Sequence, residues 1–215
     1  MSQFRLARLS LLLAAIGLNV LPTLSHAQDS KPAAPAAGAP AAAPAATVRP
    51  EIFKLLDPAA VKASMDAKNY ADVQSRIDQA AATPALTPYE LFVINRLRVA
   101  LASTTNNAPM AMTALEAVIE SGKLDKKSQG DFIQALANYH YNAKDYPNAI
   151  KWFTRYQTET GDVASVRPYI IRAYYFSNDF ARAKQELMAD LTAKQQAGKT
   201  PTIEELQLLA NTGSK

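Results

Sequence analysis

Few side chains in this chain are suited to catalysis. Outside the expected leader (residues 1–27) only one histidine, His140, remains, and the sequence has no cysteine. These counts exclude cysteine nucleophiles and ordinary zinc sites, and leave His140 as the only base for a Ser-His-Asp relay. His140 falls on an apolar helical stripe, which favours a structural core histidine. The nineteen acidic residues single out no catalytic pair, and the seven glycines form no phosphate-binding loop. We therefore expect no enzymatic activity, no cofactor and no metal.

The stretch over residues 129–159 predicts two antiparallel helices. Apolar residues recur at helical spacing before and after the sequence Lys144-Asp145-Tyr146-Pro147. Asp145 is a good helix N-cap, and Pro147 falls in the first turn, where its missing N–H costs nothing. Two apolar stripes this close together must face each other.

Helix-capping residues repeat along the chain and predict an all-α fold. Caps of the same kind stand at Asn69, Asn107, Asp145 and Asp179, and glycines at 122, 161 and 198 end the second helices. Thr87-Pro88-Tyr89-Glu90 forms a capping box. The other expected helix starts are Asp57, Ser128, Ser165 and Thr200 or Thr202. The expected helix pairs span about 57–83, 87–122, 128–161 and 165–198, with a final helix at 200–212.

The best copy resembles the tetratricopeptide repeat (TPR) family. Its small residue in the first helix is Ala137, its turn is Asp145-Tyr146, and its early alanine in the second helix is Ala149. The resemblance implies a right-handed superhelix of antiparallel helix pairs, a TPR-like α-solenoid, in which first helices line a concave groove. The whole chain is also similar to secreted TPR proteins of Gram-negative bacteria.

The resemblance assigns polar and aromatic residues to this groove. They are Gln134, Asn138, Tyr141, Arg172, Tyr175, Phe176, Gln207 and Asn211. Such residues can hydrogen-bond an extended peptide and offer aromatic contact area. The alternative, that they are merely solvated polar positions, stays open at this point.

The N-terminal region predicts export. Residues 1–27 combine Arg5 and Arg8, an apolar core and a small-x-small cleavage site at Ser25-His26-Ala27, as in a secretory signal peptide. Residues 28–50 predict a disordered Ala/Pro-rich linker, and residues 51–215 the repeat domain. Losing two arginines lowers the formal net charge from +4 to +2, which is not typical of nucleic-acid binding. We expect a periplasmic location, with secretion as the alternative, and no transmembrane anchor after cleavage.

The sequence therefore predicts a non-catalytic scaffold of the cell envelope that binds another protein or a peptide. One alternative is an accessory helical domain of an envelope enzyme, such as a peptidoglycan-processing one. Another is an oligomerising structural module. Its self-association would use the final helix, because Leu206, Leu208 and Leu209 cannot all be covered by one preceding pair.

Overall fold

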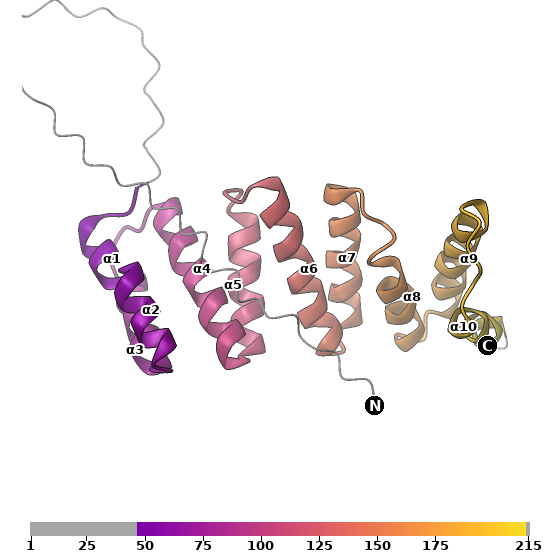
Figure 1. Cartoon of the computed structure of the whole chain (residues 1–215), viewed down its shortest axis with the longest axis horizontal. Coiled ribbons are helices and arrows are strands. Elements are labelled where there is room, and N and C mark those ends of the chain that lie inside the picture. The colour runs from indigo at the N-terminus through magenta and orange to yellow at the C-terminus, as the bar shows by residue number, and fades with distance from the viewer. Residues whose placement is uncertain (1–46, 214–215) are drawn as a thin grey trace, which may run out of the picture. The chain divides into compact units, whose positions relative to one another are not determined.

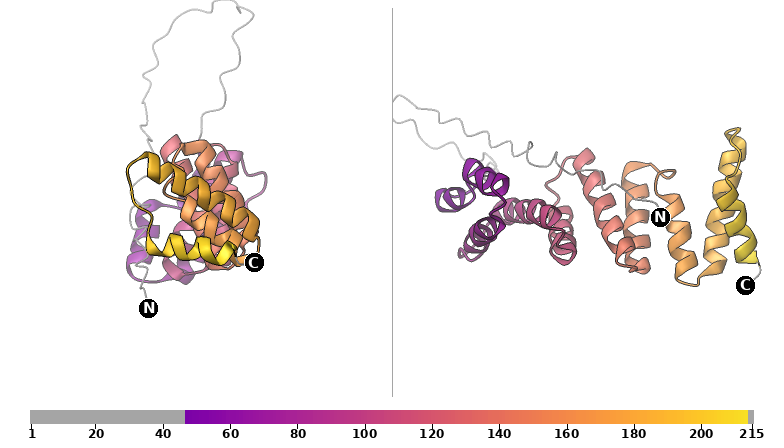
Figure 2. Two further views of the ribbon diagram at one scale, coloured as in Figure 1. Left: turned by 90° about the vertical axis from the view of Figure 1, so that its right-hand side faces the viewer. Right: turned by 60° about the horizontal axis from the view of Figure 1, so that its bottom comes forward.

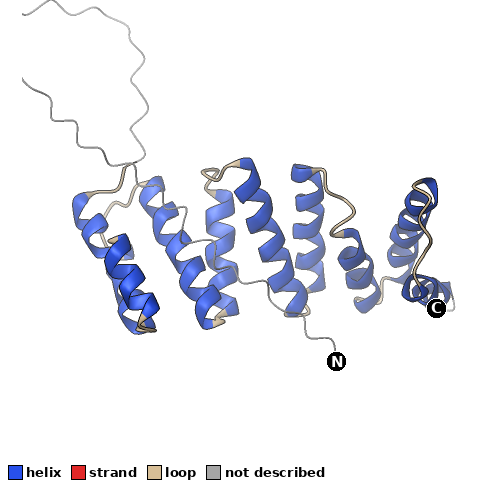
Figure 3. Cartoon of the chain, in the orientation of Figure 1, coloured by secondary structure: helices blue, strands red, loops and turns tan. Residues whose placement is uncertain are grey.

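The computed structural model describes residues 47–213, and every regular element in that range is a helix (Figures 1 and 3). The predicted all-α class is confirmed for these residues. The expected signal peptide, and the linker up to residue 46, lie outside the described residues. The chain divides into two compact units, residues 1–90 and 91–215, and each is described by itself.

The first unit contains three helices and the start of a fourth. These are α1 (Pro50–Leu55), α2 (Pro58–Asp66), α3 (Tyr70–Ala81) and the first turn of α4 (Pro88–Thr105). Both α1 and α2 pack against α3, and the buried side chains between them include Ile52, Val61, Val73 and Ile77. The sequence did not predict α1, because six residues are too few to show a helical period.

The second unit holds the rest of α4 and six further helices. These are α5 (Ala108–Glu120), α6 (Lys126–Asn142), α7 (Tyr146–Thr160), α8 (Arg167–Phe176), α9 (Phe180–Gln196) and α10 (Ile203–Gly213). From α5 to α10 each helix packs against the next one in the chain, and Figure 2 shows α10 lying beside α9. The hairpin predicted over residues 129–159 is α6–α7. Among residues 47–213, no helix is long and apolar enough to cross a membrane.

One turn recurs at four places in the described residues. Its first residue is left-handed, with φ between 54° and 61°, at Lys68, Asn106, Lys144 and Asn178. The next residue caps the following helix, its side chain accepting from the backbone N–H three residues on, at Asn69, Asn107, Asp145 and Asp179. Each cap also donates its own N–H to the carbonyl five residues earlier, at 2.8–2.9 Å. This closure is a Schellman motif, and it confirms the four predicted caps.

Two helix starts differ from the sequence prediction. Asp125, not Ser128, caps α6, because its carboxylate accepts from both the N–H and the hydroxyl of Ser128. Ser165 is likewise held by a carboxylate three residues earlier, that of Asp162, so α8 begins only at Arg167. Helix α6 therefore has an aspartate as its N-cap, whereas α8 begins after Val166 without a side-chain cap.

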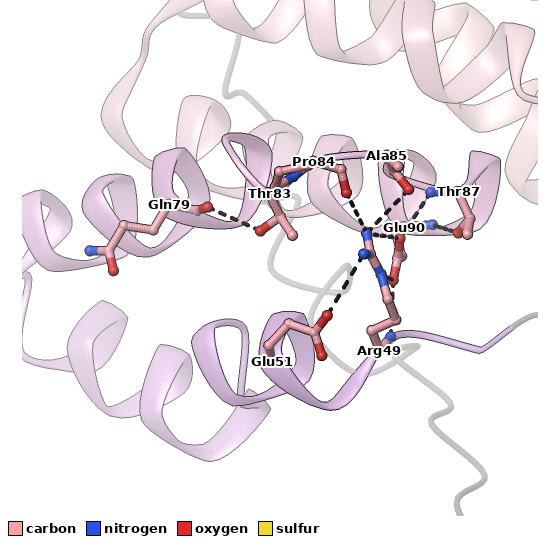
Figure 4. A network of polar contacts seen from close by, with 8 residues as sticks. All are labelled: Arg49, Glu51, Gln79, Thr83, Pro84, Ala85, Thr87 and Glu90. Atoms are coloured by element: carbon pink, nitrogen blue, oxygen red, sulfur yellow. Dashed lines mark hydrogen bonds and ion pairs between the residues drawn. The ribbon is translucent and has the colours of Figure 1, made fainter.

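The predicted capping box at the start of α4 is confirmed, and it is part of a larger network (Figure 4). Glu90 is fully buried. Its Oε1 accepts from the backbone N and the Nε of Arg49, at 3.0 and 2.8 Å, and its Oε2 from Arg49 Nη2 at 3.0 Å. Arg49 Nη2 also donates to the carbonyls of Pro84 and Ala85. Arg49 thus links the start of α1 to the loop that precedes α4.

Hydrogen bonds from the Arg49 side chain lower the pKa of Glu90 from its usual 4.5 to about 2, against the opposing effect of burial. The same contact raises the pKa of Arg49. A carboxylate whose pKa is lower when folded stabilises the protein fully above its unfolded pKa, and this contribution falls as the pH drops toward the folded pKa.

We predict that replacing Lys144 with glycine stabilises the second unit by about 0.5–1 kcal/mol. A side chain in the left-handed region costs roughly 1–2 kcal/mol, and the greater entropy of glycine in the unfolded chain offsets part of this gain. Urea unfolding followed by Trp152 fluorescence would measure the change. Asn178→Gly is the matched control and should gain less, because asparagine tolerates this conformation. A less stable Lys144→Gly protein would contradict the turn geometry.

We predict that Glu90→Gln makes the protein less stable at pH 7, and that the gap to the natural protein narrows as the pH falls from about 4.5 toward 2. The narrowing follows because the natural protein loses the Glu90–Arg49 contribution in that range. Thermal unfolding monitored by circular dichroism at several pH values would show it. The control is Glu51→Gln, which removes an exposed carboxylate 3.7 Å from Arg49 Nη1 and should follow the natural protein. A constant gap across this range would refute the role of Glu90.

Candidate binding surface

Helix α6 places three of the predicted groove residues on one face. Gln134, Asn138 and Tyr141 are four and three residues apart, the spacing of successive turns of a helix. All three are half-buried. Two side-chain amides and a phenol therefore line this side of α6, and each offers both hydrogen-bond donors and acceptors.

Helix α8 contributes a cation and two aromatic rings. Arg172 and Phe176 are one helical turn apart, and both are exposed, Phe176 by 52%. Tyr175 is half-buried and meets Phe176 edge-on, with ring centroids 5.9 Å apart. No carboxylate among the described residues forms an ion pair with Arg172. An unpaired guanidinium beside an exposed ring gives this part of α8 both charge and apolar contact area.

Aromatic side chains connect the two helices. Tyr141 of α6 packs edge-on against Tyr169 of α8, with ring centroids 5.6 Å apart, and against Tyr146 of α7, at 5.7 Å. Tyr146 in turn stacks on Phe176 at 5.5 Å. We call this group the aromatic cluster, and its members are Tyr141, Tyr146, Phe153, Tyr169, Tyr175, Phe176 and Phe180. It joins α6, α7, α8 and α9, so Tyr141 has a packing role that the sequence did not predict.

Burial and the charge of Arg172 act in opposite directions on the pKa of Tyr141. Burial raises the pKa of the Tyr141 phenol, and the positive charge of Arg172 opposes this rise. The structure thus brings together Tyr141, Arg172, Tyr175 and Phe176, four residues that the sequence assigned to one surface. Gln134 and Asn138 continue that surface along α6.

The other two predicted residues, Gln207 and Asn211, are exposed on α10. This helix packs against α9, which carries none of the predicted residues. Lys194 of α9 forms ion pairs with Asp190 of its own helix and with Glu205 of α10, and Glu205 also completes a capping box with Thr202. These contacts fix the start of α10 against α9. No described contact links the side-chain amides of Gln207 and Asn211 to α6 or α8.

His140 serves the turn after α6. Its Nδ1 lies 2.9 Å from Asp145 Oδ2, and its side chain is mostly buried. A hydrogen bond from the Asn148 side chain, together with a smaller contribution from His140, lowers the pKa of Asp145. These contacts support the prediction of a structural histidine.

The structure also shows a pocket that the sequence analysis missed. It has a volume of about 350 Å³ and mostly apolar walls, and it lies between α4 and α5. Arg98 donates from Nη1 to Asn95 Oδ1 at 3.1 Å. The lining residues are Asn95, Arg98, Pro109, Met110, Thr113 and Ala114. The sequence does contain a sign of this pocket. A shift of 38 residues, the distance between the caps Asn107 and Asp145, superposes two polar residues and an alanine on three large apolar residues. The first set is Asn95, Arg98 and Ala114, and the second is Ile133, Leu136 and Trp152.

Comparison with known proteins leaves the chain without an assigned family. No protein-family model, no curated protein and no solved structure matches it. Its function is therefore inferred from its own residues and their geometry.

Proposed function

We propose that this chain is a non-catalytic scaffold of the cell envelope that binds another protein or a peptide. In this proposal the helix pairs wind into a right-handed TPR-like superhelix, and the first helices of the pairs, among them α6 and α8, line its concave groove. The repeated turn supports a repeat architecture, because it reverses the chain in the same way at each copy. The predicted signal peptide supports a periplasmic location.

The proposal rests mainly on the exposure of Arg172 and Phe176, which lie one helical turn apart on α8. Both side chains are exposed, and Arg172 has no acidic partner among residues 47–213. Arginine and aromatic residues are enriched at protein interfaces, where they supply most of the binding energy. The exposed ring of Phe176 adds apolar contact area that a merely solvated polar face does not need.

The aromatic cluster would also keep this surface rigid. Phe176 stacks on Tyr146, and Tyr141 contacts three rings of α7 and α8. Side chains that are already fixed lose little conformational freedom on binding, so more of the contact energy appears as affinity. The amides of Gln134 and Asn138 would then select a partner backbone or polar side chain by hydrogen bonding.

We predict that the double variant Asn138→Ala/Arg172→Ala binds the partner at least about tenfold more weakly, because it removes an amide and a charged contact from the surface. The partner would first be identified by crosslinking in the native envelope, and its affinity then measured by calorimetry. Circular dichroism should show unchanged helix content, since neither side chain is in the core.

The matched control is Lys184→Ala, which removes an exposed cation from α9 instead of α8. It should bind as tightly as the natural protein. Equal loss of affinity in the control and the double variant would argue for a general charge effect. A large loss of helix content in the double variant would count against the assignment of these residues to a binding surface.

Self-association through α10 is a second candidate, favoured by two exposed apolar residues. Ile203 is 72% exposed and Leu206 is 51% exposed, one turn apart on the same helix. If this face joins two copies, sedimentation velocity should show a dimer that Leu206→Asp converts to a monomer. A single monomer species for the natural protein at high concentration would eliminate this candidate.

A further inference from the structure

The pocket between α4 and α5 occupies a position that other helix pairs fill with their own side chains. Counting from each cap, the residue seven positions later is Ala114 in α5, Trp152 in α7 and Glu186 in α9. The residues twelve and nine positions before each cap lie on the preceding helix, and they are Asn95 and Arg98 in α4, Ile133 and Leu136 in α6, and Arg167 and Ile170 in α8. The three helix pairs of the second unit can therefore be compared residue by residue.

In the α6–α7 pair this position is filled by apolar side chains. Ile133 and Leu136 are fully buried, and the Trp152 side chain is 2% exposed. Lys151 and Arg155 lie over the indole ring, 5.0 and 5.3 Å from its centroid. The α6–α7 pair therefore fills this position with its own side chains.

In the α8–α9 pair an ion pair takes the place of the indole. Arg167 Nε lies 3.5 Å from Glu186 Oε2, and both side chains are half-buried. Ile170 supplies the apolar neighbour. The fold thus accepts a guanidinium and a carboxylate together at this position.

In the α4–α5 pair a guanidinium lies one helical turn later than in the α8–α9 pair, because Arg98 is equivalent to Ile170 and not to Arg167, and the equivalent of Glu186 is Ala114. The three equivalent residues are Asn95, Arg98 and Ala114, and all three line the pocket of about 350 Å³. Ala114 is buried and has only a methyl group where Trp152 has an indole ring. Arg98 donates one hydrogen bond, to Asn95, and no carboxylate of the described residues forms an ion pair with it. A guanidinium has five N–H donors, which leaves a forked pair free to meet a carboxylate.

We propose that this pocket binds an aspartate or glutamate side chain of a partner protein, next to an apolar side chain that packs on Pro109 and Met110. The carboxylate would accept hydrogen bonds from the N–H groups of Arg98 other than the Nη1 group that donates to Asn95. The volume is near the lower end of small-molecule sites, about 300–1,000 Å³, and suits a side chain whose polypeptide adds contacts outside the pocket. The site uses α4 and α5, not the residues of α6 and α8, and so stands independently of the surface proposed above.

The test is a titration of the isotope-labelled full chain, observed by NMR, with the blocked peptide acetyl-Leu-Glu-Leu-amide. We expect saturable shifts of the Arg98 side-chain N–H, the Met110 methyl group and the Thr113 amide. The peptide with glutamine in place of glutamate should bind at least about tenfold more weakly, because it lacks the charge-assisted hydrogen bonds. Equal binding of the two peptides would overturn the proposal. Free glutarate should also bind more weakly than the glutamate peptide, and tighter binding of glutarate would mean that the ligand is a small acid, which would overturn the assignment to a protein side chain.

Two variants locate the site. Arg98→Gln should weaken the glutamate peptide at least about tenfold. Ala114→Glu should also abolish its binding, because the new carboxylate fills the pocket from within and pairs with Arg98. The matched control, Ala117→Glu, adds the same charge to an exposed position of α5 and should leave binding unchanged. Undiminished peptide binding by Arg98→Gln would overturn the proposal, whatever the folding of the Ala114 variant.

Discussion

The turn that closes each helix pair is the constraint on which the rest of the structure depends. A left-handed residue ends one helix, and the asparagine or aspartate that follows caps the next. Because the turn has a fixed length, it also fixes which residues of the second helix point inward. The fourth residue after each cap is buried, as is the eighth; these are Val73, Ala111, Ala149 and Ala183, and Ile77, Leu115, Phe153 and Leu187. Register, and with it the core, follows from one local backbone geometry.

Because the register is constant, equivalent positions of the helix pairs can be compared, and their differences in side chain can be interpreted. The core positions vary only among apolar side chains, which changes packing but not chemistry. The seventh residue after the cap varies from an indole to a carboxylate to a methyl group, and each change alters what the neighbouring side chains can contact. Similarly, α8 presents an unpaired guanidinium where α6 presents an amide, Asn138. Both binding proposals rest on such differences between otherwise equivalent positions.

Much of this fold could be predicted from the sequence because its signals are local. The caps, the capping box of Thr87 and Glu90 and the C-terminal glycines each act within a few residues of the chain. Contacts between residues far apart in the sequence could not be predicted. Arg49 donates to Glu90, 41 positions later, and no short-range sequence pattern indicates this contact. Two of the residues assigned to the candidate surface, Arg172 and Phe176, are exposed on one helix. The packing of Tyr141 against three other rings was missed, because helical period alone does not distinguish a groove residue from one between helices.

The central claim, that one turn repeats and sets a common register, can be tested by native-state amide hydrogen exchange. The amides of Asn69, Asn107, Asp145 and Asp179 each donate to a carbonyl five residues earlier. All four should exchange much more slowly than the amide of Lys123, an exposed loop residue whose N–H reaches only the hydroxyl of Ser121. Fast exchange at any of the four would show that the turn at that cap is not closed, and would contradict a register common to all the helix pairs.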